Sequence, residues 1–468
     1  MTFDSLAFLI FLPVVVGIHW LLPHRWRKYW LLAVSYFFYM YWNPALIVLL
    51  LFSTVVDYCC SLGMEEAAPK RRKFLLLVSV FVNLSLLFSF KYLDFSGETV
   101  NTLCALIGIS YRVPAFNLIL PVGISFYTFQ TMSYTIDVYR GKLPAERDFV
   151  TFALYVTFFP QLVAGPIERA GSLLPQLKEE KTLCREDLAA GFQLLVSGFF
   201  RKVVIADLCG RFVDRVYGAE GAVEGAAVAV ATLLFAVQIY CDFAGYSEIA
   251  AGSARLMGIR LMRNFDRPYL SGSIREFWRR WHISLSGWFT DYIYIPLGGS
   301  RKGLKRQLFA TLIVFAASGL WHGARWTFVL WGLFHGLLLS LELLLPKRKE
   351  QHCRWWVVLT FCLVTLSWVF FRSNTVEQAV EFLTALVRPW DIGAAWNVLG
   401  MTDLDAIQIV LVLLHLPGLH QLTKTMDEGA PRAKLADVAY VYYLTVILCA
   451  WLLRLENHAV STFIYFQF

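Results

Sequence analysis

Residues 307–341 read QLFATLIVFAASGLWHGARWTFVLWGLFHGLLLSL, and Arg325 is the only Asp, Glu, Lys or Arg side chain among them. Two apolar runs, 307–321 and 326–341, flank a short polar break. A helix needs about 20 mainly apolar residues to cross a bilayer. Both runs fall slightly short of that length, so we expect membrane helices, some of them re-entrant and buried within the protein.

Uncharged runs of this kind recur along the whole chain. The clearest others are 6–22, 74–90, 225–240, 355–371 and 438–453, and two shorter ones, 29–42 and 45–56, are divided by Asn43-Pro44. Asn-Pro is a turn signal, so a helix is expected to stop there. Further runs at 118–136, 149–164, 188–200 and 407–422 bring the expected number of segments to about 11 to 13.

The composition points to the same class of protein. Of the 468 residues, 58% are hydrophobic and only 16% are charged, whereas a soluble domain has about 45–50% apolar and about 25% charged residues. This excludes a disordered chain, a disulfide-rich secreted module and a simple cytosolic enzyme. The nine cysteines include no C-x-x-C pair, so we expect neither a disulfide framework nor a metal site. The sequence predicts an all-α polytopic membrane protein, with residues 1–468 as a single domain.

Clusters of basic residues predict the orientation. Arg25, Arg27 and Lys28 follow the first run, and the basic residues 70–73 follow the third. Cytoplasmic loops carry an excess of Lys and Arg. Two crossings separate the clusters, so both are expected in the cytoplasm, with the N-terminus outside. The net charge of +8 is therefore attributed to membrane loops and not to nucleic-acid binding. No internal repeat supports an inverted-repeat transporter.

Ionisable residues concentrate in one region, 238–335, between apolar runs. Such residues are costly at membrane depth and commonly mark a functional site. His282 lies beside two arginines, and His322 lies between Trp321 and Gly323. Either imidazole can be catalytic or structural, because a neutral imidazole in a dry pocket can accept a proton from a hydroxyl group. We expect His335 to hydrogen-bond a neighbouring helix and His19 to be a packing residue.

Several motifs together resemble one family. They are REFWRRWHISLS at 275–286, GLWHG at 319–323, LPVGISFY at 120–127, IDVYRG at 136–141, FPQLVAGP at 159–166 and DFAGYS at 242–247. Their order along nearly the whole chain is similar to that of the membrane-bound O-acyltransferase (MBOAT) superfamily. Within its bacterial branch, the alginate O-acetyltransferase membrane subunit gives the nearest resemblance.

The resemblance implies a ring of about eleven transmembrane helices, with re-entrant helices around a central tunnel, and a catalytic core at about residues 117–345. It places the superfamily's invariant histidine at His322. Its second catalytic position, often Asn in eukaryotic members, falls at His282. His322 is expected to act as the general base, with His282 or a neighbour stabilising the oxyanion.

The resemblance also implies the reaction. An acyl group, expected to be acetyl, passes from a cytoplasmic thioester donor across the bacterial inner membrane for O-acylation of a cell-surface polysaccharide. Acetyl-CoA or an acylated carrier protein is the expected donor, with no bound cofactor. Membrane lipid and a periplasmic or extracellular acyltransferase are the expected partners. D-alanyl transfer to teichoic acid and peptidoglycan O-acetylation are alternatives, and a transporter or a non-catalytic scaffold are the alternatives outside enzymes.

Other residues are candidates for the donor site or the tunnel. They are Asp242, Tyr246, Arg279, Arg280, Ser284 and Trp321. Asp242 can equally be a structural hydrogen-bond acceptor, and the basic residues at 301–306 can equally form an ordinary cytoplasmic loop. Phe463, Tyr465 and Phe468 keep the spacing of an ending seen among partners in bacterial D-alanylation. Tyr465 is therefore either an acyl relay or part of an interfacial aromatic anchor.

Overall fold

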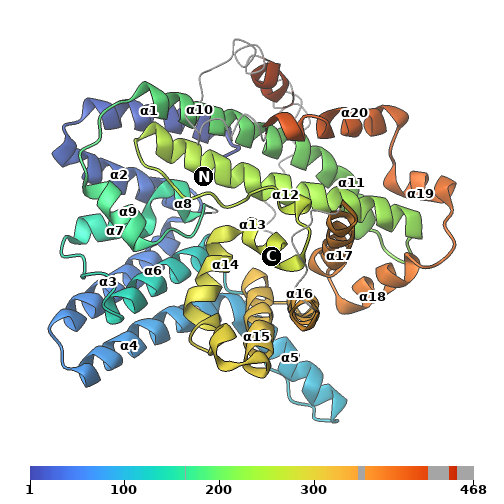
Figure 1. Ribbon diagram of the computed structural model, residues 1–468, viewed down its shortest axis with the longest axis horizontal. Coiled ribbons are helices and arrows are strands. Elements are labelled where there is room, and N and C mark those ends of the chain that lie inside the picture. The colour runs from blue at the N-terminus through green and yellow to red at the C-terminus, as the bar shows by residue number, and fades with distance from the viewer. Residues whose placement is uncertain (164, 346–353, 420–441, 449, 451–468) are drawn as a thin grey trace. The chain divides into compact units, whose positions relative to one another are not determined.

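The computed structural model describes residues 1–163, 165–345, 354–419, 442–448 and 450 (Figure 1). Every regular element among these residues is a helix, and no strand occurs among them. The all-α prediction is therefore confirmed for this part of the chain. The residues fall into two compact units, Met1–Cys184 with Ala254–Met262, and Arg185–Ser253 with Arg263–Phe468.

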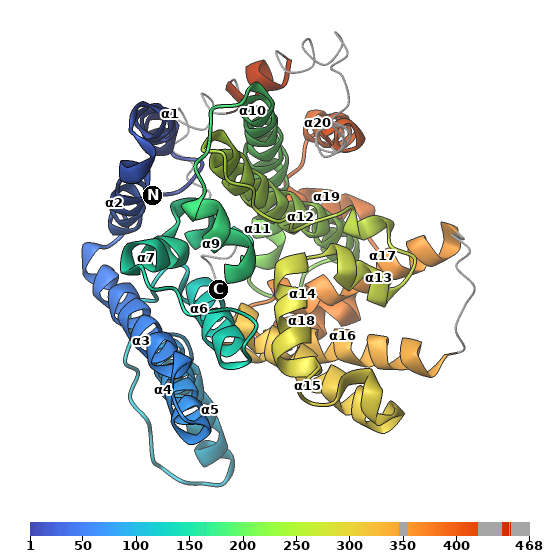
Figure 2. The same ribbon diagram turned by 60° about the vertical axis from the view of Figure 1, so that its left-hand side comes forward.

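The first unit contains nine α-helices in its described residues. They are α1 (Leu6–Leu21), α2 (His24–Met40), α3 (Ile47–Glu65), α4 (Pro69–Leu87), α5 (Leu93–Leu106), α6 (Ile124–Tyr139), α7 (Phe149–Thr157), α8 (Phe159–Leu162) and α9 (Ala170–Lys178). A short 3-10 turn, η1 (Pro44–Leu46), precedes α3, and a π-helical turn, η2 (Phe88–Tyr92), joins α4 to α5. Figure 2 shows α3 and α4 side by side.

Local sequence signals explain two features of this unit. The Asn43 side chain accepts a hydrogen bond from the backbone N–H of Ala45 at 3.0 Å, and Pro44 opens η1. The break predicted at Asn43-Pro44 is therefore confirmed. Between α3 and α4, the buried carboxylate of Asp57 accepts hydrogen bonds from Ser79 at 2.6 Å and Asn83 at 2.9 Å. These bonds give a buried polar group partners within the protein.

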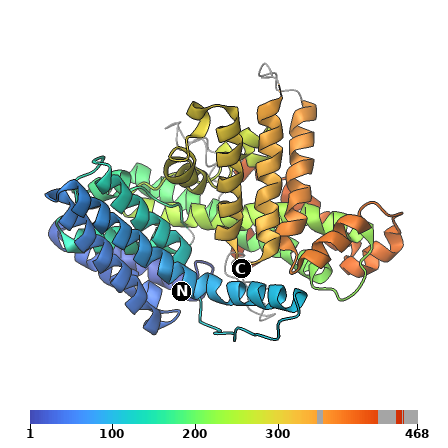
Figure 3. The same ribbon diagram turned by 90° about the horizontal axis from the view of Figure 1, so that it is seen from below.

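The second unit carries the remaining α-helices of the described chain. They are α10 (Arg185–Phe199), α11 (Asp207–Tyr217), α12 (Gly225–Leu256, whose last turn belongs to the first unit), α13 (Ile274–Arg280), α14 (Ile283–Phe289), α15 (Leu304–His322), α16 (Trp326–Leu344), α17 (Arg354–Arg372), α18 (Val376–Ala385), α19 (Ile392–Leu399) and α20 (Asp403–Leu413). A π-helical turn, η3 (Phe200–Ala206), joins α10 to α11. Three helices, α15, α16 and α17, stand in a row that runs from yellow to orange in Figure 3.

Glycines let α10 and α12 pack with their backbones in close contact. A Cβ atom on Gly245 would lie 2.7 Å from the carbonyl oxygen of Gly198, and one on Gly252 would lie 2.7 Å from that of Gly191. Small residues at such crossings allow the close approach common between membrane helices. The two helices run side by side in Figure 1.

The same contact buries ion pairs. Lys202, on η3, pairs with Asp242 of α12 at 2.8 Å and with Asp207 at 3.0 Å. Arg201 pairs with Glu248 of α12 at 3.1 Å. Both basic side chains are only 2% exposed. Removing one partner of a buried pair costs about 3–5 kcal/mol, because it leaves an uncompensated charge.

Some of the predicted segments form helices shorter than a membrane crossing. Within the described residues, six helices are long and apolar enough to span a membrane, or seven if the bent pair Ile392–Leu399 and Asp403–Leu419 counts as one. The run at 118–136 becomes helical only from Ile124, and the run at 149–164 breaks at Phe158, ahead of Pro160. The chain is thus a multi-pass membrane protein by these criteria, and the ring of eleven helices stays a prediction.

Replacing Gly245 by alanine should destabilise the second unit. The added methyl group would press on the Gly198 carbonyl oxygen and on the Lys202 backbone N–H, at 2.7 and 3.1 Å. Overpacking of this kind costs about 1–3 kcal/mol. Thermal unfolding of the detergent-purified protein should therefore begin at a lower temperature. Gly17→Ala is the matched control, since no atom lies within 4 Å of its new Cβ. Equal stability of the two variants would contradict the close contact.

Candidate active site

A helical hairpin holds His322 in place. His322 is the last residue of α15, and α16 begins at Trp326 after a short turn. Cβ atoms on Gly319 and Gly332 would collide with the carbonyl oxygens of Phe328 and Phe315, so the two helices need glycine at both positions. A Cβ on Gly323 would likewise strike the Phe328 ring. The glycines of the GLWHG motif therefore set the position of the imidazole.

Aromatic side chains surround the His322 ring, which is 3% exposed. The ring lies edge-on to Trp331 with centroids 5.0 Å apart, and it also contacts Trp321 at 5.1 Å and Phe371 at 5.4 Å. These rings come from α15, α16 and α17. They exclude water from the imidazole and restrict its rotation.

His282 lies at a sharp corner between two short helices. α13 ends at Arg280, α14 begins at Ile283, and His282 takes a left-handed conformation with φ of +44°. A positive φ is uncommon for a residue with a side chain, and at such a site it suggests a functional constraint. The side chain is 0% exposed. The corner therefore holds a buried imidazole between α13 and α14.

Asn264 fixes the orientation of His282. The side-chain oxygen of Asn264 lies 3.2 Å from His282 Nδ1, 3.2 Å from the Ser284 backbone N–H and 2.9 Å from Ser284 Oγ. The backbone N–H of Ser284 can only donate, so the Asn264 atom facing it must be the oxygen. The favourable arrangement then places the proton of the neutral imidazole on Nδ1 and the lone pair on Nε2.

Burial keeps this imidazole neutral. Desolvation by the surrounding side chains lowers the pKa of His282 from 6.5 to about 3. At neutral pH its Nε2 therefore accepts a hydrogen bond or a proton. In this tautomer Nε2 is not a donor, which disfavours the expected role of His282 in stabilising an oxyanion.

The structure brings the two histidines together. Their ring centroids are 6.4 Å apart, and Trp321 contacts both rings, at 5.8 Å from His282 and 5.1 Å from His322. Forty residues separate the two positions in the sequence. Two imidazoles at this distance can each reach a hydroxyl group of one acceptor molecule.

A groove approaches the pair within the second unit. Its cavity has a volume of about 590 Å³ and its lining includes Ile283, Leu285 and Ser318, which are close in sequence to the two histidines. Arg275 and Arg279 are exposed at the same groove. The groove thus combines apolar side chains with two cations and the carboxylate of Asp291. The lining itself includes neither imidazole.

The other candidates differ in their surroundings. The Ser284 hydroxyl donates a hydrogen bond to the side-chain oxygen of Asn264, and Arg280 forms an ion pair with Glu276 at 2.5 Å. Tyr246, on α12, is 0% exposed. The buried pair of Asp242 with Lys202 supports the structural alternative for Asp242. Tyr465 lies outside the described residues.

Asn264 is a site residue that the sequence analysis missed. An uncharged amide in a polar segment gives no signal of charge or periodicity, and its contact with His282 spans 18 residues. The role expected for His335 is confirmed: its Nε2 lies 2.9 Å from Ser367 Oγ on α17, and Trp278 donates to its Nδ1 at 3.3 Å. Among the described residues, no group of three or more His, Cys, Asp or Glu side chains is placed to hold a metal ion.

Comparison with known proteins agrees with the motifs. Residues 140–371 match the model of the membrane-bound O-acyltransferase family. The protein named "Probable alginate O-acetylase" of Azotobacter vinelandii is 36% identical over the full length of both chains. The protein of the same name from Pseudomonas aeruginosa is 38% identical over 92% of this chain and 84% of its own. A peptidoglycan O-acetyltransferase of Helicobacter pylori is 35% identical over 77% of this chain and 73% of its own.

The matched region, 140–371, contains both histidines, Asn264 and the helices that position them. Full-length similarity at this level, together with the matching motifs, settles the family: the chain is an O-acyltransferase that belongs to the membrane-bound O-acyltransferase family.

Proposed function

We propose that the protein transfers an acetyl group from a cytoplasmic thioester for O-acetylation of a cell-surface polysaccharide of the alginate type, in the bacterial inner membrane. The juxtaposition of His322 and His282, with the His282 tautomer held by Asn264, carries the proposal. Full-length similarity to proteins named for alginate O-acetylation supports the substrate class.

The proposed chemistry uses the two imidazoles in different ways. His322 accepts the proton of the attacking hydroxyl group while the oxygen forms a bond to the thioester carbonyl carbon. The carbon–sulfur bond then breaks, and the imidazolium returns the proton to the leaving thiolate. His282 Nε2 accepts a hydrogen bond from a second hydroxyl group of the same acceptor and so orients the acceptor, because Nδ1 carries the proton held by Asn264. Proton and charge therefore balance over the cycle.

The groove beside the histidines fits a thioester donor. Its exposed arginines, Arg275 and Arg279, can pair with the phosphates of acetyl-CoA or of a carrier-bound pantetheine. Its apolar lining suits the uncharged arm of such a donor. Arg280, another candidate for the donor site, is not part of this proposal, because its side chain is paired with Glu276.

Peptidoglycan is the second candidate acceptor. The Helicobacter pylori relative, named a peptidoglycan O-acetyltransferase, is 35% identical over 77% of this chain. The alginate type is favoured because its similarity extends over the full length of both chains. D-alanyl transfer and the Tyr465 relay stay alternatives, as does an acyltransferase partner on the outer face.

Replacing His322 by alanine should reduce acetyl transfer by at least about 100-fold, because a general base contributes about 10²–10⁴ in rate. The measurement is transfer from labelled acetyl-CoA by the purified protein, with the purified outer-face partner where the acceptor needs one. Alginate and peptidoglycan fragments serve as separate acceptors. His415→Ala is the control, because that ring, just after α20, bonds the carbonyl oxygen of Leu411 at 2.8 Å. Unchanged transfer by a folded His322→Ala variant would refute the assignment.

Changing Asn264 should alter the pH dependence of the reaction. In Asn264→Asp the oxygen acceptor is kept, but a carboxylate beside Nδ1 favours the imidazolium and raises the pKa of His282 from about 3. If activity needs the neutral imidazole, the acid limb of the pH–activity profile should then shift to higher pH. Asn264→Ala removes the acceptor and should lower kcat by about 10- to 100-fold at all pH values. Identical pH profiles for the wild type and Asn264→Asp would contradict the positioning role.

The proposed orientation places Lys70 in the cytoplasm. In a cysteine-free background, Lys70→Cys should react with an impermeant maleimide only after the cells are permeabilised. Arg112→Cys is the matched control, since it is also exposed and the candidate span Pro69–Leu106 separates the two positions. It should react in intact cells. The reverse pattern would place the N-terminus inside.

A further inference from the structure

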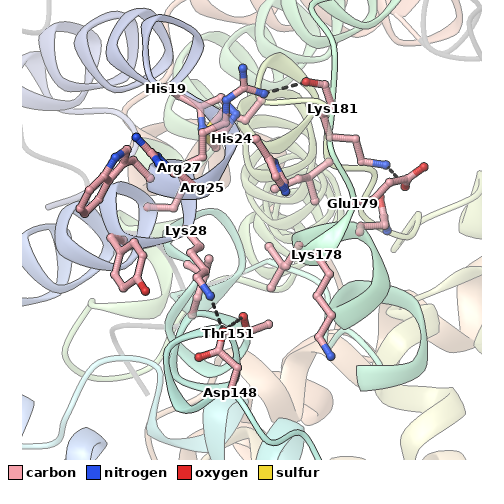
Figure 4. Close-up of a pocket in the computed structure, with 18 of the residues that line it drawn as sticks. His19, His24, Arg25, Arg27, Lys28, Asp148, Thr151, Lys178, Glu179 and Lys181 are labelled. Atoms are coloured by element: carbon pink, nitrogen blue, oxygen red, sulfur yellow. Dashed lines mark hydrogen bonds and ion pairs between the residues drawn. The ribbon is translucent and has the colours of Figure 1, made fainter.

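A second cavity lies in the first unit, far in sequence from the histidine pair. Its volume is about 540 Å³, and it opens at the turn between α1 and α2 (Figure 4). Its lining includes His19, His24, Arg25 and Arg27, with side chains from α7 and α9 opposite them. The proposed acetyl transfer assigns no role to this cavity.

Most of the charges around this cavity are neutralised in pairs. Three ion pairs line it: Lys28–Asp148 at 2.6 Å, Lys178–Glu146 at 2.5 Å and Lys181–Glu179. Figure 4 shows two of these, the Lys28 and Lys181 pairs, on separate sides of the opening. The carboxylate of Asp148 also accepts a hydrogen bond from the Thr151 hydroxyl at 2.5 Å. Each acidic side chain that lines the cavity is therefore paired with a lysine.

Two guanidinium groups at this cavity have no acidic partner among the described residues. Arg27 donates to the backbone carbonyl oxygens of Lys181 at 2.7 Å and Leu22 at 3.1 Å, and its guanidinium stacks on Trp20 at 4.8 Å. Carbonyl oxygens and an aromatic ring hold the group in place without cancelling its charge. Arg25 is exposed, and no described residue forms an ion pair or hydrogen bond with it. The cavity therefore carries a net positive charge.

His19 adds a polar group to the interior of this cavity. Its side chain is 3% exposed, so the packing role expected from the sequence is compatible with its burial. Neither ring nitrogen forms a hydrogen bond of normal distance and angle with a described residue, although the backbone of Met257 lies beside the ring. A buried polar group usually has a partner. Because both nitrogens are buried, His19 adds polarity to the cavity wall without being a contact for a ligand.

The surface that leads to the cavity is apolar. Along α1, Leu6, Ile10 and Val14 are 52%, 62% and 51% exposed, and Leu21 at its end is 84% exposed. Such a row suits contact with lipid chains. Trp26 and Tyr29 are also largely exposed at the cavity. Tyr and Trp beside Arg are typical of the zone where lipid headgroups meet the hydrocarbon.

We propose that this cavity binds the phosphate group of an anionic phospholipid, with Arg25 and Arg27 as its cationic contacts and the acyl chains lying along α1. A lipid is favoured over a free phosphate because the cations begin where the exposed apolar row of α1 ends. Anionic lipids are attracted to basic clusters at a membrane surface, by about 1 kcal/mol for each Lys or Arg.

The test measures lipid retention by the full-length protein. Native mass spectrometry of the detergent-solubilised chain compares phosphatidylglycerol, phosphatidylcholine, inorganic phosphate and CoA as probes. We expect the wild type to retain phosphatidylglycerol in preference to phosphatidylcholine. Arg25→Gln should weaken this binding by about fivefold, with a further loss in the double variant with Arg27→Gln. Arg25 has no structural contact to lose, so its variant should fold.

Arg71→Gln is the matched control. Arg71 is an exposed arginine in another basic cluster of the same unit, so it reports general attraction between lipid and basic loops. It should leave retention unchanged. Equal retention in Arg25→Gln and the wild type would overturn the proposal. Binding of inorganic phosphate or CoA that depends on Arg25, without retention of phosphatidylglycerol, would overturn the assignment to a lipid.

Discussion

A polar atom surrounded by apolar side chains must find its partner inside the protein, and this requirement organises the second unit. The single oxygen of Asn264 accepts from two groups of Ser284 and faces His282 Nδ1, so one amide settles both the corner before α14 and the tautomer of the imidazole. The ion pairs of Lys202 and Arg201 follow the same rule on α12. Each polar group placed here limits how the neighbouring helices can move.

Close contact between helices is the second feature that organises this unit. Gly319 and Gly332 bring α15 against α16, and Gly198 and Gly245 bring α10 against α12. Side chains at these positions would force the helix backbones apart. The ion pairs of Lys202 and Arg201 with α12 would then be too long to form. The rings around His322 pack in the space that the first contact creates. Packing and hydrogen bonding therefore support each other.

Composition and motifs predicted the class of fold and the two histidines, because apolar runs and clustered ionisable residues are visible in a single sequence. The end of a helix at Asn43-Pro44 was also predictable, since its cause is local. Asn264 was not, because its role arises from a contact across 18 residues. The course of the run at 149–164 was not predictable either, since hydropathy alone does not reveal that its helix breaks ahead of Pro160.

The left-handed backbone of His282 limits which residues evolution can place there. At φ of +44°, glycine, Asn and Asp are the residues best accommodated, His is also enriched, and β-branched side chains are strongly disfavoured. The resemblance to the superfamily places Asn at this position in many eukaryotic members. His and Asn share two properties that suit this corner: both offer a hydrogen-bonding head group, and both tolerate a positive φ. The backbone conformation at residue 282 therefore restricts the side chains that fit there, in addition to any chemical requirement.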